Sequence, residues 1–448
     1  MTDFHCELAW LSGPRPAADV LIQTRGDRIT SVAAGTPRPE HATHLAGLTL
    51  PGLANTHSHV FHRALRGRTH GRAADFWAWR EQMYPLAERL DPESLYQLAL
   101  GTYAEMALSG ITSVGEFHYL HHQSGGHRYA DPNELGRAVV RAAHDAGIRI
   151  TLLDTCYLQA ELTGEPLSGP RRRFDDGTWQ GWAARVAELA DEPMTRIGAA
   201  IHSVRAVPKH ALSSVAEFAD SRGMPLHVHL SEQPAENAAC LSVHGVTPTQ
   251  LLGAEGALGT ATTAVHATHL TDQDVRHLGE TGTSISMCCT TERDLADGVG
   301  PAAALARAGS PLCVGSDGHS VIDLWEEARA IELDERLVTG VRGHLSVEQL
   351  LVALTAAGAR SLGWDAGLLA PGKLADLVTL RLDTPRMAGA ATGDPLAHAV
   401  FAAGAADVST VVVGGRILVD DGVHTLVERP GTVLADAIAT VTEDVESR

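Results

Sequence analysis

A short unit recurs along the middle of this chain: a helix-like segment, a glycine and a brief apolar run. Gly147 precedes the largely apolar run 148–153, and Gly223 precedes the run 224–230. Glycine readily adopts the left-handed conformation that ends a helix. Short, nearly continuous apolar runs are typical of parallel strands that are covered on both faces. The repetition therefore predicts successive βα units, and similar units begin at Gly110, Gly282 and Gly309.

Eight strand-like runs can be counted, and polar residues gather where they end. Eight βα units in a chain of 448 residues predict an α/β fold with a (β/α)8 barrel, which we place at residues 51–371. In such barrels the reactive side chains lie at the carboxyl ends of the strands. The expected strand ends lie near His59, Phe117, Asp154, His202, His229, His266, Met287 and Asp317.

The two ends of the chain have a different pattern. Residues 18–22 and 28–32 are short strand-like runs separated by turns, and residues 375–380 and 410–419 have the pattern of hairpin strands. We therefore expect residues 1–50 and 372–448 to form one small β-sandwich domain beside the barrel.

Charge and composition argue against several classes of partner. A net charge of −19 disfavours nucleic acid, which selects a basic face. The one clear basic run, Arg171 to Arg173, lies in a stretch rich in Gly and Pro, and we interpret it as a solvated loop first and as a functional patch second. No apolar stretch reaches membrane-spanning length, and the first residues lack the pattern of an export signal. With six cysteines, we expect a cytoplasmic protein with reduced thiols and no membrane partner.

The pair His57 and His59 ends the first expected barrel strand. Side chains two residues apart on a strand point to the same side, so both imidazoles can face one metal ion. Such a pair is weak evidence in a chain with 24 histidines, because a histidine in an apolar run is more often a hydrogen-bonded core residue. With His229 and Asp317, however, the pair makes a nitrogen and oxygen donor set suited to one divalent ion. We expect Zn²⁺, with Fe²⁺ or Mn²⁺ as alternatives.

Two further residues could serve hydrolysis at such a metal. Glu232 comes three residues after His229 and could act as a proton shuttle. The alternative is a carboxylate that caps the next helix. His266, at the end of another apolar run, could polarise the electrophile or hold the attacking water. A metal-bound water has a pKa near neutrality and is a usable nucleophile.

These motifs resemble the amidohydrolase superfamily over almost the whole chain. The matching segments are Pro51-Gly52 before His57-Ser58-His59, residues 229–232, residues 265–270, residues 315–317 and residues 371–378. His202 ends the fourth expected strand, where dinuclear members of the superfamily usually carry a bridging lysine. The resemblance therefore implies a mononuclear branch of deaminase type.

Four more segments, residues 75–84, 116–122, 202–207 and 290–298, look like those of formimidoylglutamate deiminases. That resemblance implies that Glu232 and His266 handle protons and polarisation, and that Asp317 accepts a proton from the metal-bound water. It assigns the metal to His57, His59, His229 and Asp317, and the substrate to Arg80, Tyr119, His202 and Arg205. His62 departs from the family pattern, which has glutamine there, although His62 could still donate a hydrogen bond to the substrate.

The implied substrate, N-formimino-L-glutamate, carries two carboxylates, and arginine is the best partner for a carboxylate. Similar proteins are commonly homodimers, so a homodimer is expected here. A purine or pyrimidine deaminase is an alternative, disfavoured by an aromatic content of 4%. A non-catalytic barrel-fold binding protein and a dinuclear hydrolase of cyclic amides are further alternatives. We expect a mobile segment over the site at residues 65–72.

Overall fold

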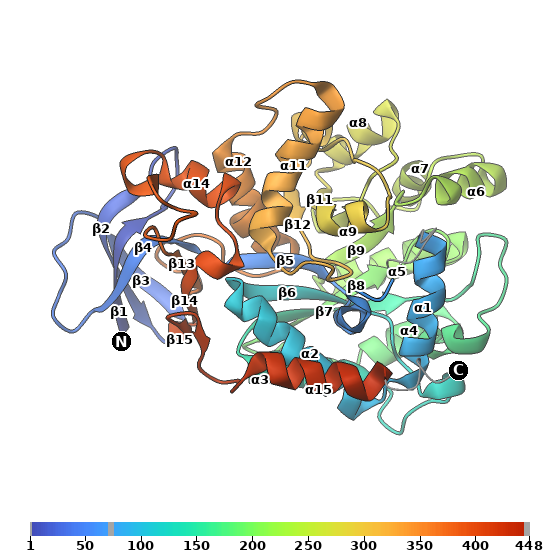
Figure 1. Ribbon diagram of the computed structural model, residues 1–448. Helices are drawn as coiled ribbons and strands as arrows, with labels where there is room; N and C mark the ends of the chain where they lie inside the picture. Colours follow the sequence, from blue (N-terminus) through green and yellow to red (C-terminus); the bar gives the residue numbers. More distant parts are fainter. Residues whose placement is uncertain (1, 70–75, 443–448) are drawn as a thin grey trace.

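The computed structural model describes residues 2–69 and 76–442, and its centre is a parallel sheet of eight strands (Figure 1). Each strand pairs with the next strand along the chain, in the order β5 to β12. These strands end at or near the residues where the sequence predicted strand ends, which confirms that prediction. The strands are β5 (Leu53–Ser58), β6 (Ile111–His118), β7 (Arg149–Cys156), β8 (Thr195–Ile201), β9 (Leu226–Leu230), β10 (Thr262–His266), β11 (Ser284–Met287) and β12 (Leu312–Val314).

The sheet closes on itself just beyond β12. The backbone N–H of Asp317 donates to the carbonyl of His57 at 3.0 Å, and the N–H of His59 donates to the carbonyl of Asp317 at 3.2 Å. Ser58 and Asp317 thus form a parallel bridge between the last and the first strand. This closure completes the predicted (β/α)8 barrel and brings the two ends of its chain segment together.

Helices cover the outside of the barrel, and glycine ends several of them as the sequence predicts. Gly147 and Gly282 end α3 and α8 with φ of 80° and 67°. The helices are α1 (Phe76–Arg89), α2 (Pro92–Leu108), α3 (Glu134–Ala146), α4 (Trp179–Val186), α5 (Lys209–Ser221), α6 (Pro234–His244), α7 (Pro248–Ala254), α8 (Asp272–Thr281), α9 (Cys289–Asp294), α10 (Ala302–Ala308), α11 (Leu324–Thr339), α12 (Val347–Val352), α13 (Gly358–Ser361), α14 (Pro395–Phe401) and α15 (Pro430–Thr442).

Short 3₁₀ and π segments connect these elements: η1 (Val60–Leu65), η2 (Ser124–Gly126), η3 (Gly169–Phe174), η4 (Ala353–Ala357), η5 (Ala390–Thr392) and η6 (Ala405–Asp407). The expected mobile segment begins at the end of η1, and residues 70–72 of it lie outside the described part of the chain.

Strands from both ends of the chain form a second sheet beside the barrel, as expected (Figure 1). Its order is β16-β15-β14-β13-β4-β1-β2-β3, and β4 and β13 join the two ends in antiparallel register. The strands are β1 (Thr2–Ala9), β2 (Ala17–Arg25), β3 (Arg28–Ala33), β4 (Thr43–Pro51), β13 (Leu377–Leu380), β14 (Val408–Val413), β15 (Arg416–Asp420) and β16 (Val423–His424).

A buried ion pair connects this sheet to the barrel. Arg149, at the start of β7, donates to both carboxylate oxygens of Asp376 at 2.8 and 3.2 Å, and each side chain is 1% exposed. Bidentate geometry of this kind is among the stronger polar contacts available to a buried pair. Asp376 lies directly before β13, so the pair fixes the tail segment against the barrel.

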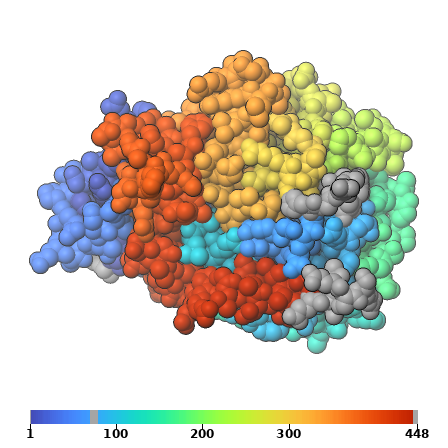
Figure 2. Space-filling view, in the orientation of Figure 1, coloured from blue at the N-terminus to red at the C-terminus, as the bar shows by residue number. Residues whose placement is uncertain are grey.

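The C-terminal helix α15 lies along α2 of the barrel rather than on the second sheet (Figure 1). In the space-filling view the red atoms of this C-terminal segment lie beside the blue atoms of the barrel (Figure 2). A side chain at Gly101 of α2 would come within 2.9 Å of the backbone of Leu434, so glycine permits this close approach. The expected division of the chain at residues 50 and 372 stays a prediction.

The interpretation of the basic run as a solvated loop was wrong for Arg173. Its side chain is fully buried. It donates to the carbonyl oxygens of His122 and Leu90, both at 2.7 Å, and of Ala87. Arg173 therefore stabilises the loops between α1 and α4 through backbone groups that the sequence pattern does not reveal.

Candidate active site

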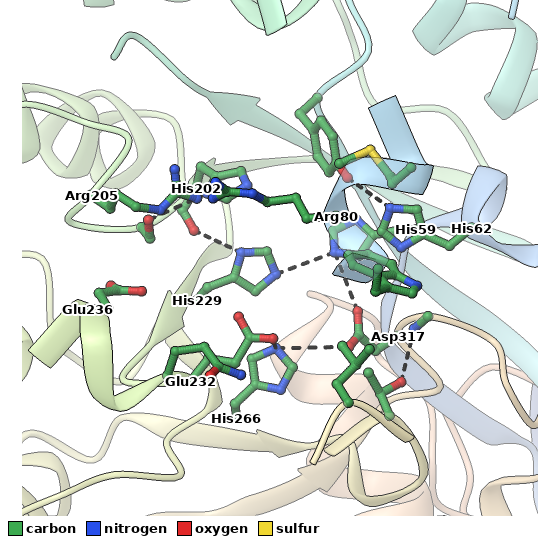
Figure 3. A pocket seen from close by; sticks show the side chains of 18 of the residues that line it. His59, His62, Arg80, His202, Arg205, His229, Glu232, Glu236, His266 and Asp317 are labelled. Atoms are coloured by element: carbon green, nitrogen blue, oxygen red, sulfur yellow. Dashed lines mark hydrogen bonds and ion pairs between the residues drawn. The ribbon is translucent and has the colours of Figure 1, made fainter. Parts of the chain in front are cut away.

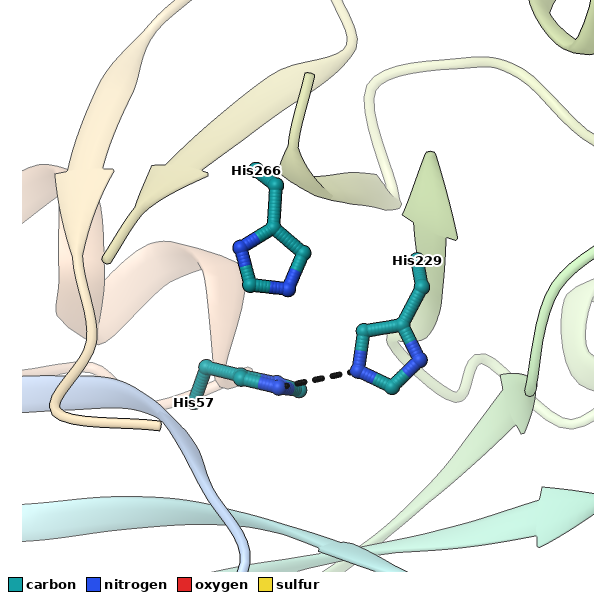
Figure 4. Close-up of side chains that lie close together, drawn as sticks. All are labelled: His57, His229 and His266. Atoms are coloured by element: carbon teal, nitrogen blue, oxygen red, sulfur yellow. Dashed lines mark hydrogen bonds between the residues drawn. The ribbon is translucent and has the colours of Figure 1, made fainter. Parts of the chain in front are cut away.

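Four expected metal ligands converge at the carboxyl end of the barrel; Figure 3 shows His59, His229 and Asp317, and Figure 4 shows His57 beside His229. His57 and His59 come from the end of β5, His229 from β9, and Asp317 from the closure after β12. His229 Nε2 lies 3.1 Å from His57 Nε2 and 3.3 Å from His59 Nε2. Asp317 Oδ1 lies 3.3 Å from His57 Nε2 and 3.4 Å from His59 Nε2. The structure thus brings together all four residues that the sequence predicted as ligands.

The hydrogen bonds around these rings leave lone pairs facing one another. His59 Nδ1 lies 3.0 Å from the Phe117 carbonyl, and His229 Nδ1 lies 2.9 Å from the His202 carbonyl. Each Nδ1 must therefore carry the proton, which leaves Nε2 as an acceptor in the neutral ring. Burial lowers the pKa of His59 to about 3 and that of His229 well below its usual value, so both rings are neutral.

This arrangement fits a small cation. The acceptor Nε2 of His59 lies 3.3 Å from that of His229 and 3.4 Å from Asp317 Oδ1, which is unfavourable unless a positive centre lies between these atoms. A tetrahedral ion with metal–nitrogen bonds of about 2.0–2.1 Å has donor–donor edges of about 3.3–3.4 Å. The four donor–donor separations given above, 3.1 to 3.4 Å, agree with that geometry.

The backbone at these strand ends is unusual. Ser231, His266 and Asp317 have φ of 50°, 68° and 42°, a region that side chains with a Cβ seldom adopt. Such strain persists where the surrounding structure enforces it, commonly at functional sites. At Gly315 a Cβ would lie 2.6 Å from the His57 Cβ, so only glycine lets the closing segment approach β5 and place Asp317.

A buried carboxyl group supports the turn that carries the first two histidines. Glu116 of β6 accepts hydrogen bonds from Ser58 Oγ at 2.6 Å, from the Val60 N–H at 2.7 Å and from Tyr103 Oη at 3.2 Å. Burial raises the pKa of Glu116 to about 8 in spite of these bonds. Glu116 therefore holds the residue between His57 and His59 in place.

His266 and Glu232 lie beside the converging donors. His266 Nε2 is 3.8 Å from Glu232 Oε1 and 3.9 Å from Asp317 Oδ2, and its Nδ1 is 3.4 Å from Glu292 Oε1. Although burial opposes its charge, these three carboxylates raise the pKa of His266 to about 10. Figure 4 shows its ring beside those of His57 and His229.

The pKa of Glu232 differs from that of an ordinary surface carboxyl group. Burial raises its pKa, whereas the cationic His266 opposes that shift. For Asp317 burial acts in the same direction, but the contacts with His57 and His266 prevail and hold its pKa below the usual range. Two neighbouring carboxyl groups are thus separated in acidity, a common property of acid–base sites.

One pocket connects these residues with the expected substrate contacts. Arg80 from α1 and Arg205, which follows β8, both line it. In Figure 3 these arginines lie on the side of His202, across the pocket from Glu232 and His266. Arg205 Nη1 donates to Tyr157 Oη at 3.2 Å and to the Ala160 carbonyl at 3.0 Å, so its guanidinium is fixed at the pocket wall.

His62, where the sequence departs from the family pattern, also lines the pocket. Its Nε2 lies 2.9 Å from Tyr119 Oη, and the Trp79 ring contacts it edge-on at 4.8 Å between centroids. Burial lowers the pKa of His62 well below its usual value, so the ring is neutral. A neutral imidazole can still exchange a hydrogen bond with Tyr119, so His62 retains a polar contact at this position.

Sequence reasoning missed three residues near the site. Tyr157 follows β7 directly, and its ring lies 4.2 Å from that of His202. Glu292 lies in a segment that carried the resemblance, but its contact with His266 Nδ1 needs the fold. Glu236 lines the pocket from the first turn of α6, and no local pattern singled it out.

Comparison with known proteins shows which family the chain belongs to. The model of the amidohydrolase family matches residues 48–418. The chain belongs to the amidohydrolase family. An amidohydrolase structure from Brucella melitensis has a TM-score of 0.90 and 29% identity, and the match covers 98% of this chain and all of that one.

Two curated relatives share the reaction class but differ in substrate. Formimidoylglutamate deiminase from Pseudomonas aeruginosa is 36% identical over 92% of this chain and 94% of its own. 5'-Deoxyadenosine deaminase from Methanothermobacter thermautotrophicus is 32% identical over 88% of this chain and 87% of its own. This family member is therefore a hydrolase that acts on C–N bonds. Within the described residues no helix is long and apolar enough to cross a membrane.

Proposed function

We propose that this amidohydrolase removes ammonia from N-formimino-L-glutamate and leaves N-formyl-L-glutamate, a step of histidine degradation. The observation that carries the proposal is the pair Arg80 and Arg205 in the pocket beside the candidate metal ligands. Two guanidinium groups match a substrate with two carboxylates. The relative from Pseudomonas aeruginosa supports the same substrate. We also expect the protein to be a homodimer in the cytoplasm.

We infer that His57, His59, His229 and Asp317 hold one divalent ion, with Zn²⁺ preferred for a set of three imidazoles and one carboxylate. The convergence of their acceptor atoms supports this assignment. When bound, such an ion would polarise the substrate and lower the pKa of a water molecule toward neutrality.

Glu232 is placed to move protons. The formimino group is a cation near neutral pH, so its terminal nitrogen needs only one more proton to leave as ammonia. Water attacking the formimino carbon would give that proton to Glu232, which would pass it to this nitrogen. Asp317 would take the remaining proton as the formyl group forms. His266, whose pKa is raised to about 10, would stabilise the charge on the tetrahedral centre.

Deamination of a nucleoside is the second candidate. The aromatic content of the whole chain is low, but five aromatic residues line this pocket, where a ring could stack on them. They are Trp79, Tyr84, Tyr119, Tyr157 and Phe174. The relative that is a 5'-deoxyadenosine deaminase favours the same alternative.

Ammonia release from several substrates would separate these candidates. Purified protein loaded with Zn²⁺ should be assayed side by side with N-formimino-L-glutamate, N-formimino-L-aspartate, 5'-deoxyadenosine and guanine. We expect the highest kcat/KM for N-formimino-L-glutamate. A higher kcat/KM for 5'-deoxyadenosine or guanine would overturn the proposal in favour of the nucleoside or base reaction.

A further inference from the structure

Glu236 is a pocket carboxyl group that the reaction scheme above does not use. It lies in the first turn of α6 and lines the same pocket as Arg205 and Glu232. Figure 3 shows its carboxyl group pointing into the pocket between these two residues. Its Oε1 is buried and accepts no hydrogen bond from the residues that the structure describes. A buried acceptor of this kind is costly unless a ligand supplies a donor.

The charges around Glu236 leave its carboxyl group poised for a cation. Burial raises the pKa of Glu236 to about 7, and Glu232 acts in the same direction, whereas Arg205 and the cationic His266 oppose the shift. Arg205 is already tethered through Nη1 to Tyr157 and Ala160. An incoming positive N–H group would therefore be attracted to Glu236 and would satisfy its Oε1.

The substrate class proposed above brings such a group. An N-substituted formamidine is a strong base and is a cation near neutral pH, whereas the formyl amide that replaces it is neutral. If a carboxylate next to the amidine binds Arg205 while the reacting carbon lies near Glu232, the amidine N–H falls between them. That is the place where Glu236 faces the pocket.

We propose that Glu236 binds the cationic formimino group and so makes the pocket prefer the substrate over its neutral product. The inference rests on the proposed function. Glu236 is then a specificity residue: it attracts the amidinium before hydrolysis and loses that charge partner when the amide forms. The loss of the contact favours release of the product.

Two unreactive ligands with the same two carboxylates test this. One is the guanidino analogue of glutamate, which is cationic, and the other is N-formyl-L-glutamate, which is neutral. Their dissociation constants should be measured by calorimetry on the Zn²⁺-loaded wild type and on Glu236→Gln. One charge-assisted hydrogen bond corresponds to about a ten- to a hundredfold change in affinity. We expect that loss for the guanidino ligand, with the formyl ligand changed by less than about threefold.

Two variants serve as controls. Glu161 also lines the pocket, and its charge acts on Arg205. Glu161→Gln therefore removes a nearby carboxylate of the same kind and should leave the ratio of the two affinities unchanged. Glu236→Asp keeps the charge and should retain most of the preference, which guards against a folding defect in the first variant.

The outcomes separate this inference from the proposed function. If neither ligand binds the wild type, the proposed function and this inference both fail. If both bind but Glu236→Gln weakens them equally, only the inference is overturned, because Glu236 would then act on the shared carboxylates through Arg205. If Glu236→Gln weakens binding of the guanidino ligand alone, that result supports the inference.

Discussion

Replacing Arg205 by methionine is the most informative change to the substrate pocket. The guanidinium is held in advance by Tyr157 Oη at 3.2 Å and the Ala160 carbonyl at 3.0 Å, both on Nη1. A guanidinium has five N–H donors, so others are left for a ligand. Because the group is already ordered, little conformational entropy is lost when a carboxylate binds. Arg205→Met keeps the apolar stem and removes only these donors and their charge.

The size of the effect follows from the geometry of the pair. Two charge-assisted hydrogen bonds to one carboxylate contribute about 1.5–3 kcal/mol each, or about 3–6 kcal/mol together. At about 1.4 kcal/mol per tenfold change, Arg205→Met should lower kcat/KM by about 10²–10⁴. The control Tyr157→Phe loosens the guanidinium but keeps its charge, and should lower kcat/KM by no more than about tenfold.

The assay compares N-formimino-L-glutamate with two analogues that lack either the α- or the γ-carboxylate. In the wild type, deleting either carboxylate should lower kcat/KM. In Arg205→Met, deleting the carboxylate that Arg205 binds should not lower kcat/KM any further, as in a double-mutant cycle. Thermal melting of each variant excludes unfolding as the cause. If both deletions remain as costly in Arg205→Met as in the wild type, Arg205 does not bind a substrate carboxylate and the reasoning is refuted.

Other predictions concern the reaction and the stability of the barrel. Glu232→Gln should lower kcat by about 10²–10⁴ yet keep the metal, as ammonia assays and metal analysis would show; loss of the metal would mean that Glu232 is a ligand. Because burial raises the pKa of Glu232 above its usual 4.5, kcat/KM should fall on acidification with an apparent pKa above that value, and an acid limb at or below it would contradict this role. Arg185 donates to Asp154 at 2.7 and 2.8 Å and to Asp176 at 2.8 Å in the core, so Arg185→Met should lower the free energy of unfolding in urea at pH 7 by about 3–5 kcal/mol; an unchanged value would show that the network adds no stability.

The same network has a predictable response to acid. Burial alone would raise the pKa of Asp154, but Arg185 outweighs it and holds that pKa below the usual range. A depressed carboxyl pKa contributes stability above the pKa of the unfolded chain, about 3.9. That contribution is lost as the pH falls from there toward the lower value of the folded protein. Arg185→Met should therefore show a weaker dependence of stability on pH in this range.

Much of the barrel could be predicted because its strands are short apolar runs that follow helix-ending glycines. The four candidate metal ligands could be predicted as well, because the strands of a barrel all end at one rim and polar side chains at those ends lie close together. Asp317 was predictable as a polar residue after the last strand. Its place beside His57, however, depends on the hydrogen bonds that close the barrel and on Gly315, which only the structure shows.

Side chains that act across the fold could not be predicted from local patterns. Arg173 belongs to a basic run, yet it binds backbone carbonyls from segments more than 50 residues away and is fully buried. Its pairing depends on loop packing, which carries no periodic signal. Tyr157 and Glu236 likewise line one pocket although they come from different βα units, and no local pattern shows that proximity.

The identity of the products tests the central claim most directly. N-formimino-L-glutamate labelled with ¹³C in the formimino carbon should be incubated with the Zn²⁺-loaded protein and followed by NMR, with ammonia measured in the same sample. We expect the label to appear in N-formyl-L-glutamate, with one ammonia released for each substrate consumed. Label in formamide, with free L-glutamate, would show that the other C–N bond is broken, and an unchanged substrate signal would show that this compound is not hydrolysed; either result would contradict the account.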